Sequence, residues 1–363
     1  MKLSEIIAVL DDIAPPSLAE SWDNVGLLVG DPAQSVTRCL LTIDYTPAVA
    51  DEAKQLGCEL VVSYHPPIFS GLKRIVGPSP IFDALRNGTA IYSPHTALDV
   101  AAGGTNDLLA EILGIKDPQP LRLNDAKPGE YKLVTFVPEE NLEPLAQALF
   151  NAGAGGIGRY SHCSFRAKGE GTFWGDESTN PAIGEKGKLT KTPEVRFETI
   201  VNARQLPAVL SAFYRAHPYE EPAIDLLQLA VPPAQVGQGR IGRLPNVERT
   251  ELFAQIKRGL SLSNLLVSGP TTGKVSKAAC LAGAGRQHLP DAIAQKAELY
   301  LTGEIPHHDA LAAARAGMTV VATLHSNSER PILPKLSKRL TEKLPDLHVH
   351  VSQADRDPFI IYQ

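Results

Sequence analysis

Residues 38–65 read RCLLTIDYTPAVADEAKQLGCELVVSYH. Residues 39–43 are mostly apolar, which predicts a buried strand. Residues 46–56 predict a helix, because a threonine N-cap is followed by proline at the first helical position and a glycine comes directly after the last turn. Residues 60–63 predict a second buried strand. A strand, a crossover helix and a second strand are typical of parallel pairing in an α/β protein.

The same alternation continues to residue 113 and returns after residue 279. The remaining predicted elements are helices 80–86, 105–113, 289–296, 309–316 and 332–340 and strands 90–93, 279–282, 299–302, 319–324 and 347–352. Short apolar strands between amphipathic helices predict a parallel sheet covered on both faces. Because the two stretches are of the same type, we predict an α/β fold in which two related halves form one domain.

The middle of the chain follows another pattern. It predicts strands near 132–137, 161–165, 171–173, 194–201 and 224–229 and helices at 142–152 and 205–216. This order is β-α-β-β-α-β with an extra hairpin element, which is typical of a ferredoxin-like α+β domain. Joints rich in proline and glycine flank it at 127–129 and 231–233. We therefore predict a first half over 1–125, an inserted domain over 126–234 and a second half over 235–363.

Composition and charge narrow the function classes. The 363 residues carry a formal net charge of -5, with 43% hydrophobic and 21% charged residues. No run of Lys or Arg exceeds two residues, which argues against a nucleic-acid partner. No apolar run reaches membrane-spanning length, and residues 1–16 have the spacing of an amphipathic helix rather than a signal peptide. The four cysteines are scattered, so we expect reduced thiols in a cytoplasmic protein.

Histidines follow four of the predicted strands. His65, His95, the pair at 307–308 and His325 all lie just after strand ends, and three of these segments also carry carboxylates. In open α/β sheets the working site lies at the carboxyl ends of the strands. His325 and Glu329 are four residues apart and would share one helix face. Imidazole and carboxylate without thiolate suit zinc, manganese, iron or nickel, so we predict a divalent metal site.

Each of these residues also has an ordinary structural role open to it. A single histidine at a strand end is more often a hydrogen-bonded surface or core residue than a ligand. Glu329 could be an acid favoured by the helix dipole in a first turn. Asp99 could be a turn or cap residue. Coincidence at four strand ends is what favours the metal site.

Several longer stretches resemble one known family. They are SWDNVGLLVG at 21–30, SYHPPIF at 63–69, SPHTALD at 93–99, TGEIPHH at 302–308, HSNSE at 325–329 and, in the middle, residues 155–165 and AHPYEEP at 216–222. Together they resemble the Ngg-interacting-factor-three-like proteins, also labelled GTP cyclohydrolase I type 2 homologs. The resemblance covers nearly the whole chain, and the middle is similar to the PII/CutA-like domain of longer members.

The resemblance implies a dinuclear metal site and a ring-shaped homohexamer. By position it implies the ligands His65, Asp99, His325 and Glu329, with two divalent ions (zinc, manganese or iron) in each subunit. It also places His95 and His308 in the same cavity, where unligated imidazoles could transfer protons.

One position departs from the pattern. Many family members have histidine where this chain has Tyr64, whose phenol ordinarily titrates near 10 and is a poor ligand at neutral pH. Whether Tyr64 coordinates is open. One metal position could lack a protein ligand, be completed by water, or bind its ion weakly.

Two functions follow as expectations. The first is a metal-dependent hydrolase acting on a nucleotide or phosphoester, since two metals can lower the pKa of a bound water and hold a substrate oxygen. The cyclohydrolase label would mean water attack on a purine ring carbon, but no motif in the sequence recognises guanine or a triphosphate. The second is a hexameric metal-binding regulatory or scaffold protein without turnover, because PII/CutA-like modules commonly trimerise and sense small ligands. A role in transcription rests on the family name alone.

Overall fold

The computed structural model describes residues 1–123, 130–157, 160–203, 205–229, 236–360 and 362. The chain folds as two compact units. Unit 1 comprises Met1–Asn124 and Ala234–Gln363, and unit 2 comprises Asp125–Pro233. The joints predicted at 127–129 and 231–233 lie outside the described residues. In the described part of the chain, no helix has the length and apolar character needed to cross a membrane.

The first sheet of unit 1 has the strand order β1-β4-β3-β2-β15. Its strands are β1 (Gly26–Val29), β2 (Arg38–Thr42), β3 (Leu60–Ser63), β4 (Ala90–Ser93) and β15 (His348–Val351). Helices α1 (Leu3–Ile13) and α12 (Ile332–Lys343) pack on one face with Leu41 and Val62. Helices α2 (Pro47–Leu56) and α3 (Pro80–Asn87) cover the other face with Leu40 and Val61, so alternate strand residues enter two cores.

The second sheet of unit 1 has the order β11-β14-β13-β12-β10-β5. Its strands are β5 (Lys116–Leu123), β10 (Gly237–Glu248), β11 (Leu266–Ser268), β12 (Lys274–Ala284), β13 (Leu299–Glu304) and β14 (Thr319–Ala322). Helices α5 (Thr105–Leu113) and α8 (Arg249–Leu260) pack on one face. Helices α9 (Leu289–Ala294) and α10 (His307–Arg315) pack on the other. The short elements of the unit are α4 (His95–Val100), α11 (His325–Glu329), η1 (Pro16–Leu18) and η3 (Gly285–His288).

The prediction of a parallel sheet is correct for only part of each of the two sheets. Strands β2, β3, β4 and β15 are parallel, as are β12, β13 and β14. Strands β1, β5, β10 and β11 pair antiparallel with their neighbours. None of these four strands was expected. Each is short, rich in proline and glycine, or largely exposed, and none has a clear period-two apolar pattern.

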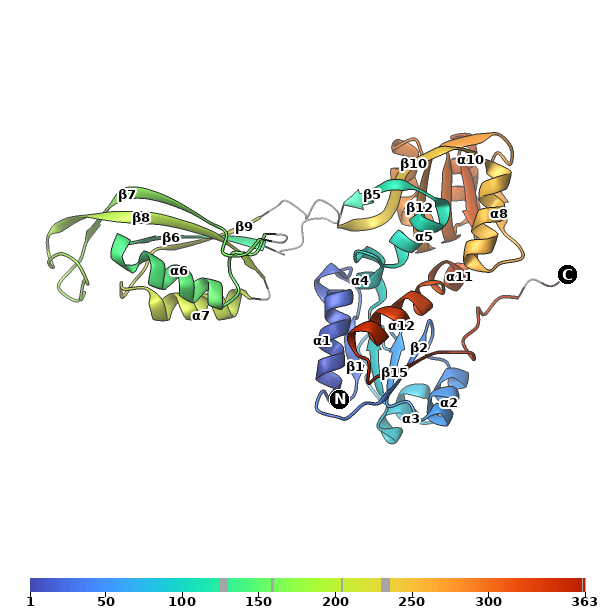
Figure 1. The fold of residues 1–363 in the computed structure, drawn as a ribbon, viewed down its shortest axis with the longest axis horizontal. Helices are drawn as coiled ribbons and strands as arrows, with labels where there is room; N and C mark the ends of the chain where they lie inside the picture. Colours follow the sequence, from blue (N-terminus) through green and yellow to red (C-terminus); the bar gives the residue numbers. More distant parts are fainter. Residues whose placement is uncertain (124–129, 158–159, 204, 230–235, 361, 363) are drawn as a thin grey trace. The chain divides into compact units, whose positions relative to one another are not determined.

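The two sheets share a strand order, yet the two sequence halves do not form separate sheets. The order β1-β4-β3-β2 in one sheet matches β11-β14-β13-β12 in the other, with an antiparallel strand at the outer edge of each. Strand β5, from the first half, lies in the second sheet, and β15, from the second half, lies in the first sheet. Helix α12 likewise packs beside α1 (Figure 1). Both halves therefore contribute to each sheet.

Unit 2 is one antiparallel sheet with two helices on one face (Figure 1). Its elements are β6 (Glu130–Val137), η2 (Glu139–Asn141), α6 (Leu142–Asn151), β7 (Ser164–Trp174), β8 (Leu189–Asn202), α7 (Leu206–Ala216) and β9 (Ile224–Gln228). The sheet order is β7-β8-β6-β9, and the core lies between the sheet and the helices. The two short strands predicted at 161–165 and 171–173 are wrong: one continuous strand pairs with β8 along its full length. Its glycines at 169 and 171 interrupt the apolar pattern, which is why the sequence did not predict one continuous strand.

Candidate metal centre

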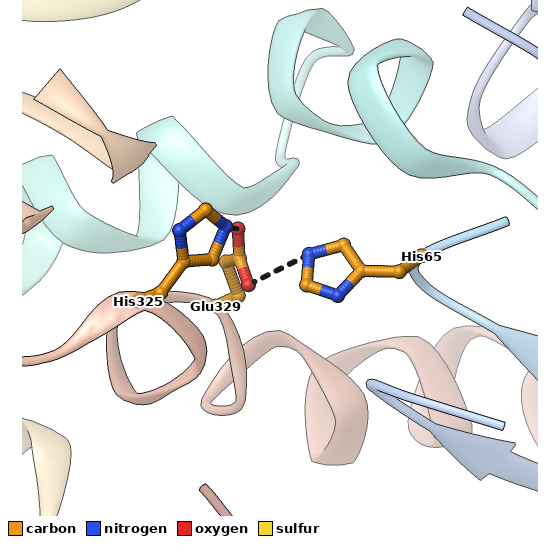
Figure 2. Close-up of side chains that lie close together, drawn as sticks. All are labelled: His65, His325 and Glu329. Carbon is orange, nitrogen blue, oxygen red and sulfur yellow. Dashed lines mark ion pairs between the residues drawn. The ribbon is translucent and has the colours of Figure 1, made fainter. Parts of the chain in front are cut away.

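Three of the predicted ligands meet at the carboxyl ends of strands in unit 1. His65 follows β3 by two residues, and His325 and Glu329 begin and end the short helix α11, which follows β14. Figure 2 shows the three side chains pointing toward one another. One donor atom from each lies within 4.8 Å of the others.

Helix α11 is held against the second sheet by its own side chains and by a glycine. Ser328 Oγ accepts a hydrogen bond from Gly283 N in β12 at 2.8 Å. Gly283 adopts φ +66°, and a Cβ there would lie 2.8 Å from Glu329 Oε1 and 3.2 Å from His325 Nε2. A side chain at position 283 would therefore displace Glu329 and His325, so glycine at this position leaves room for both side chains.

Glu329 lies between the two imidazoles. Its Oε2 is 3.2 Å from His65 Nε2, and its Oε1 is 3.3 Å from His325 Nε2. The Glu329 side chain is 4% exposed. A carboxylate this deeply buried needs charged partners, and two imidazoles supply them here.

The donor set fits a divalent cation. Among the described residues, His65 Nε2 and Glu329 Oε2 are buried without a hydrogen-bond partner although they face each other. Each histidine uses its other nitrogen for a carboxylate: His65 Nδ1 lies 2.9 Å from Asp44 Oδ1, and His325 Nδ1 lies 3.1 Å from Glu304 Oε1. Carboxylates on Nδ1 are the usual outer-shell partners of metal-binding histidines, since they fix the tautomer with Nε2 toward the ion.

The protonation equilibria agree with that arrangement. Burial alone would lower the pKa of His65, but its interactions with Asp44 and Glu329 outweigh burial and raise it to about 10. The interaction with Glu329 raises the pKa of His325 to about 9. Burial would raise the pKa of Glu329, but the two histidines lower it. The metal-free centre therefore holds protons where a cation would place positive charge, and metal binding must displace them.

Asp99 and Tyr64 form a second group beside the first. The Tyr64 hydroxyl donates to Asp99 Oδ1 and lies 2.9 Å from Thr105 Oγ1. Burial and the negative charge of Asp99 raise the pKa of Tyr64 well above its ordinary value, so it stays a neutral phenol. Burial and the charge of Glu329 raise the pKa of Asp99 to about 6. Asp99 thus lies close enough to Glu329 for the charge of that carboxylate to affect its pKa, but it lies outside the three-residue group, and Tyr64 donates a hydrogen bond to its Oδ1.

His95 lies next to this centre. The His95 ring is 5.4 Å from the His65 ring between centroids, and its Nδ1 lies 2.7 Å from Asp23 Oδ1. Its φ of +28° is a sparsely populated backbone conformation of the kind that clusters at functional sites. His308 lies exposed at the start of α10, in ring contact with His307.

Three carboxylates that hold the histidines were not assigned this role from the sequence. Asp44 comes just after β2, Glu304 ends β13, and Asp23 lies in the loop before β1. The available signal was their position near strand ends, which they share with the histidines. Pairing of a particular carboxylate with a particular imidazole depends on which strands are neighbours.

These observations define a mixed α/β protein with a histidine–carboxylate candidate metal centre at its strand ends. The chain belongs to the Duf34/NIF3 (NGG1p interacting factor 3) family, whose profile matches residues 1–358. The family inferred by resemblance is therefore confirmed.

Two similar relatives carry the name GTP cyclohydrolase 1 type 2 homolog. The protein from Halalkalibacterium halodurans is 37% identical over 362 residues, covering 98% of this chain and 97% of the relative. The protein from Bacillus subtilis is 35% identical over 364 residues, covering 98% and 97%. A solved structure, the Bacillus cereus protein related to NIF3, matches with a TM-score of 0.83 at 36% identity and covers 100% of this chain and 99% of that one.

Proposed function

We propose that this protein binds divalent metal through His65, His325 and Glu329 and acts as a metal-dependent hydrolase on a nucleotide or phosphoester. The observation that carries the proposal is a buried pair of donor atoms, His65 Nε2 and Glu329 Oε2, which lie 3.2 Å apart and have no hydrogen-bond partner. The names of the relatives support a nucleotide as the substrate class.

The residues around the centre have different proposed roles. A bound divalent ion would supply Lewis acidity and lower the pKa of a coordinated water. Asp44 and Glu304 orient the two ligating imidazoles through Nδ1. His95, oriented by Asp23, stands beside His65 as the group that moves a proton. His308 stays a prediction as a second proton carrier.

We propose one tightly held ion and a weaker second position near Asp99. Replacing Tyr64 with histidine should raise the metal content of the purified protein from near one ion per chain toward two. The tyrosine hydroxyl now donates to Asp99, whereas an imidazole would release that oxygen and add a ligand nitrogen. Elemental analysis after dialysis against zinc or manganese measures the ratio. Tyr64→Phe is the control, since it releases Asp99 without adding a ligand, and an equal gain in Tyr64→Phe would contradict the role given to the imidazole.

The test of the function is turnover by the metal-loaded protein. We expect hydrolysis of at least one member of a panel of nucleotides and phosphoesters, and a rate roughly 10²- to 10⁴-fold lower in His95→Ala with metal content unchanged. His348→Ala, at an exposed position where β15 begins, is the matched control and should retain the rate. If the zinc-, manganese- and iron-loaded proteins turn over nothing in the panel, the hydrolase proposal is wrong.

A second candidate function rests on unit 2. The unit contains a cavity of about 630 Å³ lined by aromatic and acidic side chains, among them Phe173, Trp174, Tyr219 and Glu194. This favours the alternative of a metal-binding regulatory protein that senses a small molecule. A chain that holds metal, hydrolyses nothing and binds small molecules in this cavity would fit that alternative. The homohexamer stays a prediction, which sedimentation velocity would check.

A further inference from the structure

Two exposed aromatic rings stand beside the metal centre without a role in it. Trp22 is 53% exposed and Phe69 is 56% exposed. Their ring centroids are 5.8 Å apart with planes tilted by 40°, so they touch without covering each other's faces. Large rings left this open at a rigid place are characteristic of a binding surface.

Hydrogen bonds hold the backbone segments that carry the two rings. Asp23, the next residue after Trp22, accepts a hydrogen bond from Thr96 N at 3.1 Å through Oδ2. Asn24 Nδ2 donates to Ile68 O at 2.6 Å, and Ile68 immediately precedes Phe69. These contacts tie the two ring-bearing segments to each other and to α4. The pair is therefore held in place before any ligand arrives, which reduces the entropy cost of binding.

A series of ring contacts leads from this pair to the metal ligands. Trp22 lies edge-on to His95 at 6.0 Å between centroids, and His95 lies 5.4 Å from His65. Trp22 is thus one imidazole ring, that of His95, away from the ligand His65, and Phe69 lies on Trp22. A ligand that stacks on the aromatic pair can extend an anionic group toward the centre.

We propose that Trp22 and Phe69 form a stacking platform for the base of a nucleotide whose phosphate is directed to the metal centre. This rests on the proposed function and narrows its substrate class from phosphoesters in general to those that carry a planar aromatic ring. Stacking on aromatic side chains tolerates any base, because every base has a π-face. The platform therefore selects nucleotides over sugar phosphates without choosing among bases.

The chain has two tryptophans, which makes the test direct. In the full-length Trp174→Phe protein, Trp22 is the sole tryptophan reporter. We expect saturable quenching of its emission by adenosine and by adenosine monophosphate, and none by ribose 5-phosphate. Adding Phe69→Ala should weaken adenosine binding by about 5- to 140-fold, the range for loss of one stacking ring. Free N-acetyltryptophanamide, which has no binding site and is quenched only by collision, controls for collisional quenching.

Measurements with and without a chelator distinguish a failure of this inference from a failure of the proposed function. Adenosine should quench Trp22 in EDTA as well as in zinc, because stacking needs no metal. Zinc binding without saturable quenching of Trp22 would overturn the platform and leave the metal centre standing. Saturable quenching of Trp22 without zinc binding would support the platform and contradict the hydrolase proposal. If acrylamide cannot reach Trp22 in the purified assembly, a second copy of the chain covers the rings and the platform is wrong.

Discussion

Replacing Glu329 with glutamine is expected to abolish the thermal stabilisation that zinc or manganese gives to this protein. Ligand binding stabilises the folded state by about 2.7 kcal/mol when free ligand exceeds the dissociation constant 100-fold. Glu329 is the carboxylate that both imidazoles face, at 3.2 and 3.3 Å. An amide has no charge to offer the cation, so affinity should fall by more than the roughly 10- to 100-fold typical of outer-shell changes.

Calorimetric melting with zinc, with manganese and with EDTA measures this effect. The wild-type protein should melt at a higher temperature with metal than with chelator, and the Glu329→Gln protein should melt at the same temperature in both. Glu342→Gln is the matched control, because Glu342 lies exposed on α12 with Lys338 as its ion-pair partner at 3.8 Å. Full metal-dependent stabilisation of Glu329→Gln would place the ion elsewhere.

The second large effect concerns Asp355, which joins the segment that carries Asp44 to the segment that carries the ligand Glu329. Its Oδ2 accepts from Ile43 N at 2.9 Å, next to Asp44, and pairs with Arg330 Nη1, next to Glu329. The Asp355 side chain is 1% exposed. Asp355→Ala should destabilise unit 1 by about 3 kcal/mol, because it removes the carboxylate partner of the half-buried Arg330 and leaves the buried amide of Ile43 without its acceptor.

For a unit of this size, that loss lowers the melting temperature by about 6 to 12 °C. Metal affinity should fall as well, by about tenfold, because the segments that carry Asp44 and Glu329 lose their shared anchor. Asp346→Ala, at an exposed position before β15, tests whether any loss of charge near the C-terminal segment has the same effect. A melting temperature equal to that of the wild type would show that Asp355 does not anchor these segments.

Local sequence was enough to predict the helices and strands whose ends are marked by capping or turn residues. Helix α2 begins as expected, with Thr46 as N-cap accepting from Val49 N at 3.4 Å, and ends at Leu56 with Gly57 as its C-cap at φ +64°. Strands β3 and β4 match their predicted limits because their apolar runs are bounded by turn residues. Strands β5 and β10 were missed, since prolines and glycines interrupt them and their pairing comes from residues more than a hundred positions apart.

The sequence by itself determined which residue types stand at the strand ends, and so placed His65, His325 and Glu329 as candidate ligands. Only the tertiary structure decided that Asp44 and Glu304 hold the imidazoles, that Tyr64 donates to Asp99, and that Trp22 lies exposed beside His95. The reason is physical. Periodicity and caps act within a few residues, whereas a contact between strand ends depends on the order of strands in each sheet and on how the two sheets of unit 1 meet.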